Sequence, residues 1–224
     1  MNMCMISLEK YSQRRIFCFG DSLTAGYSPP YSTENPFCVD VERILQQSEG
    51  CECLVQSLHF LENNLSSILS SNTFHNVLNK VTEVERMPLL IIWMGMKQFE
   101  TVLDSDDIAE SVINIHKAAH QKGIKTLVLG FPPILRDKKS NFSNQLTNDV
   151  NEKLKDWIDS EKKSYASSKN LSMIHYAPFP LEIEELQRKE YYASDGYHFT
   201  PEGYKYIGEY LASIVQNILN SDIA

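Results

Sequence analysis

The chain has 224 residues, which suits one large α/β domain with a sizeable buried core. Its composition, with 42% hydrophobic and 22% charged residues, is ordinary for a soluble globular protein. The formal net charge of −8 at pH 7 argues against a nucleic-acid backbone or an anionic membrane surface as the main partner. We also expect no stable membrane insertion, because the longest apolar run, around 89–94, is far too short to span a bilayer.

The cysteines favour a reducing compartment. The chain contains 5 of them, an odd number, and Cys18 falls in a predicted buried strand, so no disulfide framework is evident. Cys51 and Cys53 are too closely spaced for the usual zinc motif. The N-terminal segment lacks the order of a signal peptide, because its basic residues follow its apolar patch. We therefore expect a cytoplasmic protein with reduced thiols and no bound metal.

Apolar runs of strand length alternate with helical stretches along the chain. The predicted strands are 16–19, 53–57, 89–94, 126–130 and 171–176, and the predicted helices are 36–47, 62–78, 105–122, 144–164 and 201–220. The third and fourth strands are continuously apolar, as is typical of parallel strands that are covered on both faces. The alternation predicts a parallel sheet flanked by helices through right-handed crossovers. No repeat or linker interrupts it, so we expect a single domain over residues 1–224, with one long irregular stretch at 131–142.

A serine stands just beyond the first predicted strand. The sequence there reads Gly20-Asp21-Ser22-Leu23-Thr24-Ala25-Gly26-Tyr27. Open α/β sheets bind their ligands at the carboxyl ends of the strands, where helix N-termini also converge. Ser22 is therefore either a nucleophile in that crevice or the cap of a short helix, and this stretch alone does not separate the two.

A serine nucleophile needs a general base, and the base needs an acid to orient it. Asp195 and His198 lie together in a loop directly before the last predicted helix. That loop can fold both side chains to one side, so that the carboxylate holds the imidazole tautomer. The alternative is a turn acid beside a surface histidine, and the Asp-x-x-His pair by itself leaves both open.

The two stretches together resemble the GDSL family, also called the SGNH hydrolase superfamily. Gly20-Asp21-Ser22-Leu23-Thr24 matches its first block, just after the first strand. Asp195 and His198 match its last block, with Thr200 and Pro201 following as they commonly do. The resemblance covers nearly the whole chain and implies a flavodoxin-like three-layer α/β/α fold with a five-stranded parallel sheet, the SGNH hydrolase fold.

The resemblance also implies hydrolysis of carboxylic esters through a serine acyl-enzyme, as in GDSL-type esterases and lipases. Ser22 would be the nucleophile, His198 the base and then the acid, and Asp195 the residue that orients His198. This chemistry needs no metal or organic cofactor. The implied partner is a small-molecule ester. The sequence specifies neither its acyl chain nor its leaving group, and it leaves the oligomeric state of the protein open.

The sequence departs from the family in the two blocks that complete the oxyanion hole. The family has a glycine after the second strand, and this chain has none there. The family has an asparagine after the third strand, where this chain has Lys97. The candidates for oxyanion or substrate contacts are the Ser22 backbone, Lys97, His59, Asn63 and Asp21.

Lys97 allows two interpretations. Its ammonium group has three donors and a positive charge, but its flexible stem is poorly preorganised for an oxyanion hole. Alternatively, it faces water or pairs with Glu100. The leading hypothesis is therefore a serine esterase. The alternatives are a catalytically weak or inactive relative that binds a ligand or partner, and an acyltransferase that uses the same triad.

Overall fold

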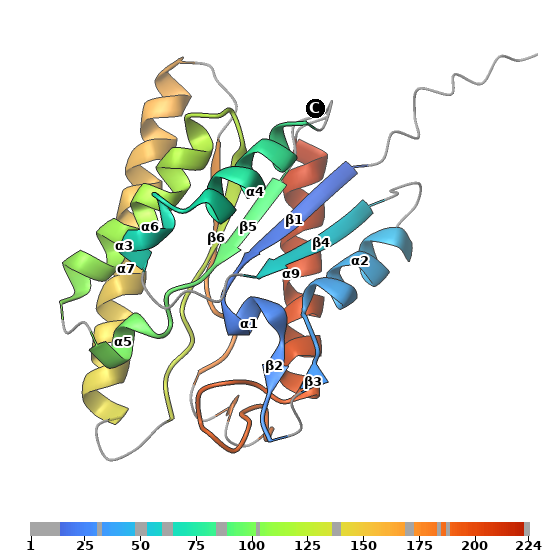
Figure 1. Cartoon of the computed structure of the whole chain (residues 1–224), viewed down its shortest axis with the longest axis vertical. Helices are drawn as coiled ribbons and strands as arrows, with labels where there is room; N and C mark the ends of the chain where they lie inside the picture. Colours follow the sequence, from blue (N-terminus) through green and yellow to red (C-terminus); the bar gives the residue numbers. More distant parts are fainter. Residues whose placement is uncertain are drawn as a thin grey trace, which may run out of the picture.

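A five-stranded parallel sheet forms the centre of the protein, with strand order β4-β1-β5-β6-β7 (Figure 1). The computed structural model describes residues 14–30, 33–47, 53–59, 65–83, 89–101, 104–135, 140–168, 173–182, 185–186 and 189–221. The strands are β1 (Arg14–Gly20), β4 (Cys53–His59), β5 (Leu89–Trp93), β6 (Lys125–Leu129) and β7 (Ile174–Ala177). All five lie at or next to their predicted positions. Counted along the chain, the strand order is that of a flavodoxin-like sheet, as expected.

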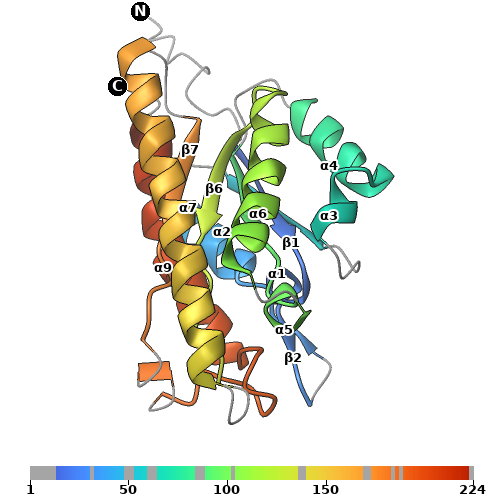
Figure 2. The same ribbon diagram turned by 90° about the vertical axis from the view of Figure 1, so that its left-hand side faces the viewer.

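Helices cover both faces of the sheet because the chain crosses it in two directions. From β1 it first moves outward to β4, and it then returns past β1 to β5, β6 and β7. Right-handed connections place helices of opposite travel on opposite faces. One face carries α2 (Cys38–Gln47) packed on α9 (Pro201–Ser221), and the other carries α6 (Ser105–His120) packed on α7 (Ser140–Ser168) (Figure 2). The three-layer α/β/α prediction is confirmed.

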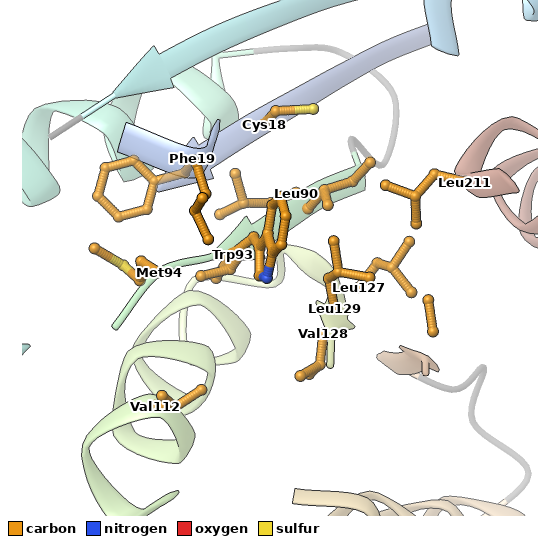
Figure 3. Packing of buried hydrophobic residues seen from close by; sticks show 14 of the residues in the cluster. Cys18, Phe19, Leu90, Trp93, Met94, Val112, Leu127, Val128, Leu129 and Leu211 are labelled. Atoms are coloured by element: carbon orange, nitrogen blue, oxygen red, sulfur yellow. The ribbon is translucent and has the colours of Figure 1, made fainter. Parts of the chain in front are cut away.

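The core lies between these layers. Every residue of β5 and β6 is buried. This explains why β5 reads as an unbroken apolar run, whereas β6 also buries Lys125 and Thr126 at its start. Trp93 lies in the middle of the cluster, with Val112 of α6 and Leu211 of α9 reaching the sheet from its two helical layers (Figure 3). None of the described helices is long and apolar enough to cross a membrane.

The predicted helix at 62–78 is wrong in its extent. The chain instead forms α3 (Leu65–Ile68) and α4 (Asn72–Thr82). The break comes at Ser71, whose side chain accepts a hydrogen bond from the backbone N–H of Phe74 at 3.1 Å and so starts a new helix. The apolar residues before the cap, such as Ile68, and after it, such as Phe74 and Val77, do not share one helical stripe, a shift of phase that the prediction of a single helix overlooked.

Three other features differ from the predictions. The helix expected at 144–164 begins at Ser140, so the irregular stretch at 131–142 is shorter than expected. A short helix, α5 (Gln98–Thr101), follows β5. A small antiparallel hairpin, β2 (Tyr27–Ser28) with β3 (Thr33–Glu34), follows α1 (Ser22–Ala25). Both are too short to leave a periodic pattern in the sequence.

A fully buried histidine lies between α6 and α7. The ring of His116 packs against Trp157, with 6.1 Å between ring centroids. Its Nδ1 lies 2.9 Å from the hydroxyl of Thr126, which also lies 2.8 Å from Nε2 of His120. Its Nε2 has no hydrogen-bond partner among the described residues. Burial, followed by the charge of His120, lowers the pKa of His116 to about 3.

The lowered pKa of His116 predicts that the stability of the folded protein depends on pH. Below its unfolded pKa of about 6.5, the unfolded chain binds a proton at this site and the folded protein does not. The free energy of unfolding therefore falls as the pH drops from 6.5 towards 3, by at most about 1.4 kcal/mol per pH unit from this residue. Urea unfolding between pH 4 and 7.5 measures the slope. We expect His116→Phe to reduce it, whereas His75→Gln, on the exposed face of α4, supplies the background; equal slopes for wild type and His116→Phe contradict the prediction.

Candidate active site

The candidate site lies where β1 and β5 end side by side. In the sheet register, Gly20 pairs with Trp93. A Cβ at position 20 would lie 1.9 Å from the carbonyl oxygen of Trp93 and 2.1 Å from the hydroxyl of Thr24, so only glycine fits. The same hydroxyl donates to the Trp93 carbonyl at 2.8 Å. The chain can therefore turn sharply out of β1 against the end of β5, at the switch point of the sheet.

Asp21 joins the two strand ends through its carboxylate. One oxygen accepts from the N–H of Leu23 at 3.0 Å and caps α1, and the other accepts from the N–H of Gly95 at 2.9 Å, just beyond β5. Burial raises the pKa of Asp21, although hydrogen bonds from the backbones of Gly95, Leu23 and Met96 favour the carboxylate. Asp21 was a candidate for substrate contact, and in the structure its two oxygens bind backbone groups.

Ser22 is the first residue of α1 and faces a histidine from the other end of the chain. Its Oγ lies 2.9 Å from Nε2 of His198, and Nδ1 of His198 lies 2.6 Å from Oδ2 of Asp195. With the ring proton on Nδ1, donated to the carboxylate, Nε2 accepts the hydrogen bond of the serine hydroxyl. The structure therefore brings the three sequence-predicted catalytic residues into one hydrogen-bonded series.

The second oxygen of Asp195 fixes the loop that carries His198. It accepts from the backbone N–H groups of Tyr197 and His198, each at 3.0 Å. Burial raises the pKa of Asp195, but the hydrogen bonds from the His198 ring and from these two N–H groups outweigh it, and the net pKa is lowered. Asp195 is therefore a carboxylate at neutral pH, as an orienting acid must be.

The residue after His198 anchors this loop in the core. Phe199 is fully buried and stacks between aromatic rings, with centroid distances of 5.2 Å to Tyr192, 5.7 Å to Phe179 and 6.3 Å to Trp93. Thr200 then caps α9 as predicted, accepting from the N–H of Gly203 at 3.2 Å. The position of His198 is thus set by buried packing on one side and a helix start on the other.

The remaining oxyanion candidates lie at the same edge of the sheet or outside the described residues. Lys97 is exposed in the turn between β5 and α5, and within the described parts of the chain its amine makes no hydrogen bond or ion pair, to Glu100 or to any other residue. His59 ends β4 and pairs with Gly20 in the sheet register, which places its backbone beside the site. Asn63 lies outside the described residues.

Two tyrosines that sequence reasoning did not single out contact the catalytic histidine. The ring centroids of Tyr27 and Tyr197 each lie 5.0 Å from that of His198. Tyr197 adjoins His198 in sequence, and Tyr27 ends the Gly20–Tyr27 stretch. Proximity to the two catalytic blocks was the only available signal, because aromatic residues at such positions have no characteristic spacing.

A serine, histidine and aspartate so arranged at the switch point of a flavodoxin-like sheet define the class of serine hydrolases. The chain belongs to the GDSL-like lipase/acylhydrolase family, whose sequence profile matches residues 16–211. A search of curated protein sequences found no match.

Several solved structures share the fold. A lipolytic G-D-S-L protein from Veillonella parvula matches with a TM-score of 0.64 and 17% identity over 90% of this chain and 97% of its own. Esterase EstA from Pseudoalteromonas matches at 0.61 and 11% over 93% and 100%. An aryl esterase from M. smegmatis matches at 0.60 and 19% over 92% and 99%. At these identities the likeness shows a common fold.

Because Asp21 bridges the loops that follow β1 and β5, we expect its substitution to lower the stability of the protein. Asp21→Asn keeps one acceptor oxygen and places an NH₂ group against the N–H of either Leu23 or Gly95, so we expect a loss of about 1–3 kcal/mol in the free energy of unfolding. Asp104→Asn is the matched control, because within the described part of the chain a single oxygen of that helix cap accepts a bond, from the N–H of Asp106, and asparagine caps equally well. Urea denaturation measures both, and equal effects contradict a bridging role.

Proposed function

We propose that this protein is a serine esterase that hydrolyses carboxylic esters of small molecules through an acyl-enzyme intermediate. The observation that carries the proposal is the unbroken series of hydrogen bonds from Ser22 through His198 to Asp195. Membership of the GDSL-like lipase/acylhydrolase family supports the same reaction class. The related structures include an esterase and an aryl esterase, which is consistent with an ester as substrate.

The geometry supports the usual two-step reaction of a serine hydrolase. Ser22 Oγ attacks the ester carbonyl carbon while its proton passes to Nε2 of His198, and Asp195 stabilises the resulting imidazolium. Collapse of the tetrahedral intermediate breaks the bond to the leaving alcohol, which takes the proton from Nε2. Water then attacks the acyl-enzyme with His198 again as base, and collapse releases the acid and restores the Ser22 hydroxyl.

One oxyanion donor is available on the nucleophile itself. The backbone N–H of Ser22 donates to no acceptor among the described residues, in contrast to the N–H of Leu23 and of Gly95, both of which bind Asp21. We assign the Ser22 N–H to the developing oxyanion. The family's asparagine amide has no equivalent at this position, because Lys97 is exposed and its amine is unpaired within the described chain.

Covalent labelling tests the nucleophile. We expect a fluorophosphonate probe to label the purified protein, because a serine hydrogen-bonded to a histidine base attacks the phosphorus centre. Ser22→Ala should abolish labelling, and Ser70→Ala, at an exposed serine between α3 and α4, should leave it unchanged. Intact-mass spectrometry gives the readout. A folded wild-type protein that gains no mass would refute the assignment of Ser22.

The lysine at position 97 favours a second candidate function. If it leaves the oxyanion one donor short, the protein is a weak or inactive hydrolase that serves as a binding protein. Removing one oxyanion donor typically costs about 10²- to 10³-fold in turnover. We therefore expect Lys97→Asn to raise kcat by about 10²-fold if the missing amide limits the reaction. The readout is the steady-state rate with a short-chain aryl ester.

The control for this substitution is Lys117→Asn. Lys117 lies in the last turn of α6, which runs back towards the amino ends of the strands and away from the site. The Lys117→Asn substitution removes the same charge and leaves the β5–α5 turn unchanged. A fall in kcat for Lys97→Asn alone would show that the ammonium group itself stabilises the transition state.

We propose a cytoplasmic location. The buried thiols of Cys18 and Cys38 are both free in the structure, which supports a reducing environment.

A further inference from the structure

The catalytic histidine needs a third constraint besides its two hydrogen bonds. Asp195 holds Nδ1 at 2.6 Å and Ser22 holds Nε2 at 2.9 Å, and these atoms lie on opposite sides of the ring. These two hydrogen bonds share one line through the ring and oppose only weakly a rotation about the Cβ–Cγ bond, which tilts the imidazole out of that line. Such a tilt turns the Nε2 lone pair away from Ser22 Oγ, and general-base catalysis depends on that alignment.

An aromatic ring supplies a contact off this line. The rings of Tyr27 and His198 meet edge to face, with centroids 5.0 Å apart and planes at 83°. We propose that Tyr27 is a positioning residue that fixes the tilt of the His198 imidazole and so aligns it with Ser22. The inference rests on the proposed esterase function and assigns a role to a side chain beyond the triad.

The backbone around Tyr27 is held firmly enough for this role. Gly26 ends α1 in the left-handed conformation, with φ 74°, and its carbonyl accepts from the N–H of Asn35 at 2.8 Å. Tyr27 then pairs with Glu34 in the β2–β3 hairpin. A Cβ at position 26 would lie 2.1 Å from the backbone of Asn35, so the hairpin is packed directly against the helix end.

A buried hydroxyl connects Tyr27 to the loop of the catalytic histidine. Tyr204 of α9 is fully buried, and its hydroxyl donates to the carbonyl oxygen of Tyr27 at 2.9 Å. Burial raises the pKa of Tyr204 well above its ordinary value, against a backbone hydrogen bond from Phe199 to the same hydroxyl, so it remains a protonated donor. The Tyr204 hydroxyl therefore contacts both the residue after His198 and the backbone of Tyr27.

The Tyr27 side chain can be removed with little effect on the rest of the fold. Tyr27 is 37% exposed, so its side chain can be truncated without opening a cavity in the core. Its contribution should appear in the chemical step, because the contact is made to the base.

Steady-state kinetics with p-nitrophenyl acetate test the proposal. We expect Tyr27→Ala to lower kcat by about threefold to tenfold with KM little changed, and Tyr27→Phe to restore wild-type kcat because the ring is retained. Tyr27→Leu, which keeps volume without a ring, should behave like Tyr27→Ala. A rise in KM at constant kcat, or failure of Tyr27→Phe to restore the rate, would overturn the proposal.

The matched control is Tyr206, a partly buried tyrosine of α9. Its ring packs on that of Tyr191 with 5.4 Å between centroids and, among the described residues, makes no ring contact with His198. Tyr206→Ala removes a partly buried tyrosine ring and should leave kcat unchanged. Thermal unfolding of all variants identifies any loss of rate that follows from loss of structure.

Proton NMR provides a readout that does not need turnover. The Nδ1 proton of His198, held between the ring and Asp195, should give a resolved downfield signal. We expect Tyr27→Ala to broaden this signal through faster exchange with water, and Tyr27→Phe to preserve it. If the wild type hydrolyses no ester, a broadened signal still supports the positioning role while the proposed function fails. An unchanged signal in Tyr27→Ala refutes the positioning role.

Discussion

The structure of the site depends on one buried carboxylate between two neighbouring strands. Asp21 binds the backbone N–H of Leu23 on the β1 side and that of Gly95 on the β5 side. Parallel strands bring their carboxyl ends to one edge, but they do not fix the conformation of the loops that follow. The carboxylate holds these two loops together, and Ser22, the proposed nucleophile, is the next residue along the chain. Its placement is therefore a consequence of backbone hydrogen bonding rather than of side-chain packing.

The other half of the triad is positioned by a different kind of force. Phe199 is buried among aromatic rings, and it holds the loop of Asp195 and His198 through the hydrophobic core. The two halves are thus anchored mainly by different forces, one by hydrogen bonds at strand ends and the other by packing. The Ser22–His198 hydrogen bond joins groups that are already in place, which is the preorganisation that catalysis requires.

The sequence predicted the sheet and the triad because both depend on strong, local signals. The apolar run of β5, the apolar residues of β6 and the two sequence blocks that carry Ser22 and His198 were readable without knowledge of the fold. The split between α3 and α4 was missed, because the prediction joined the apolar residues on either side of Ser71 without following the change in their helical phase. The contact between Tyr27 and His198 could not be read from the sequence either. It depends on a hairpin whose strands have two residues each and on a hydrogen bond from Tyr204 to the Tyr27 carbonyl, 177 residues away in sequence.

The exposed position of Lys97 limits the effect of its charge on His198. A positive charge in a dry site would oppose the imidazolium that forms on His198, because charges interact strongly at low dielectric. In water the same repulsion is reduced severalfold by the solvent and further by salt. The lysine is exposed and its amine is unpaired within the described chain, so water solvates its charge. The charge of Lys97 therefore does not block protonation of His198, and its effect on the oxyanion can be tested separately.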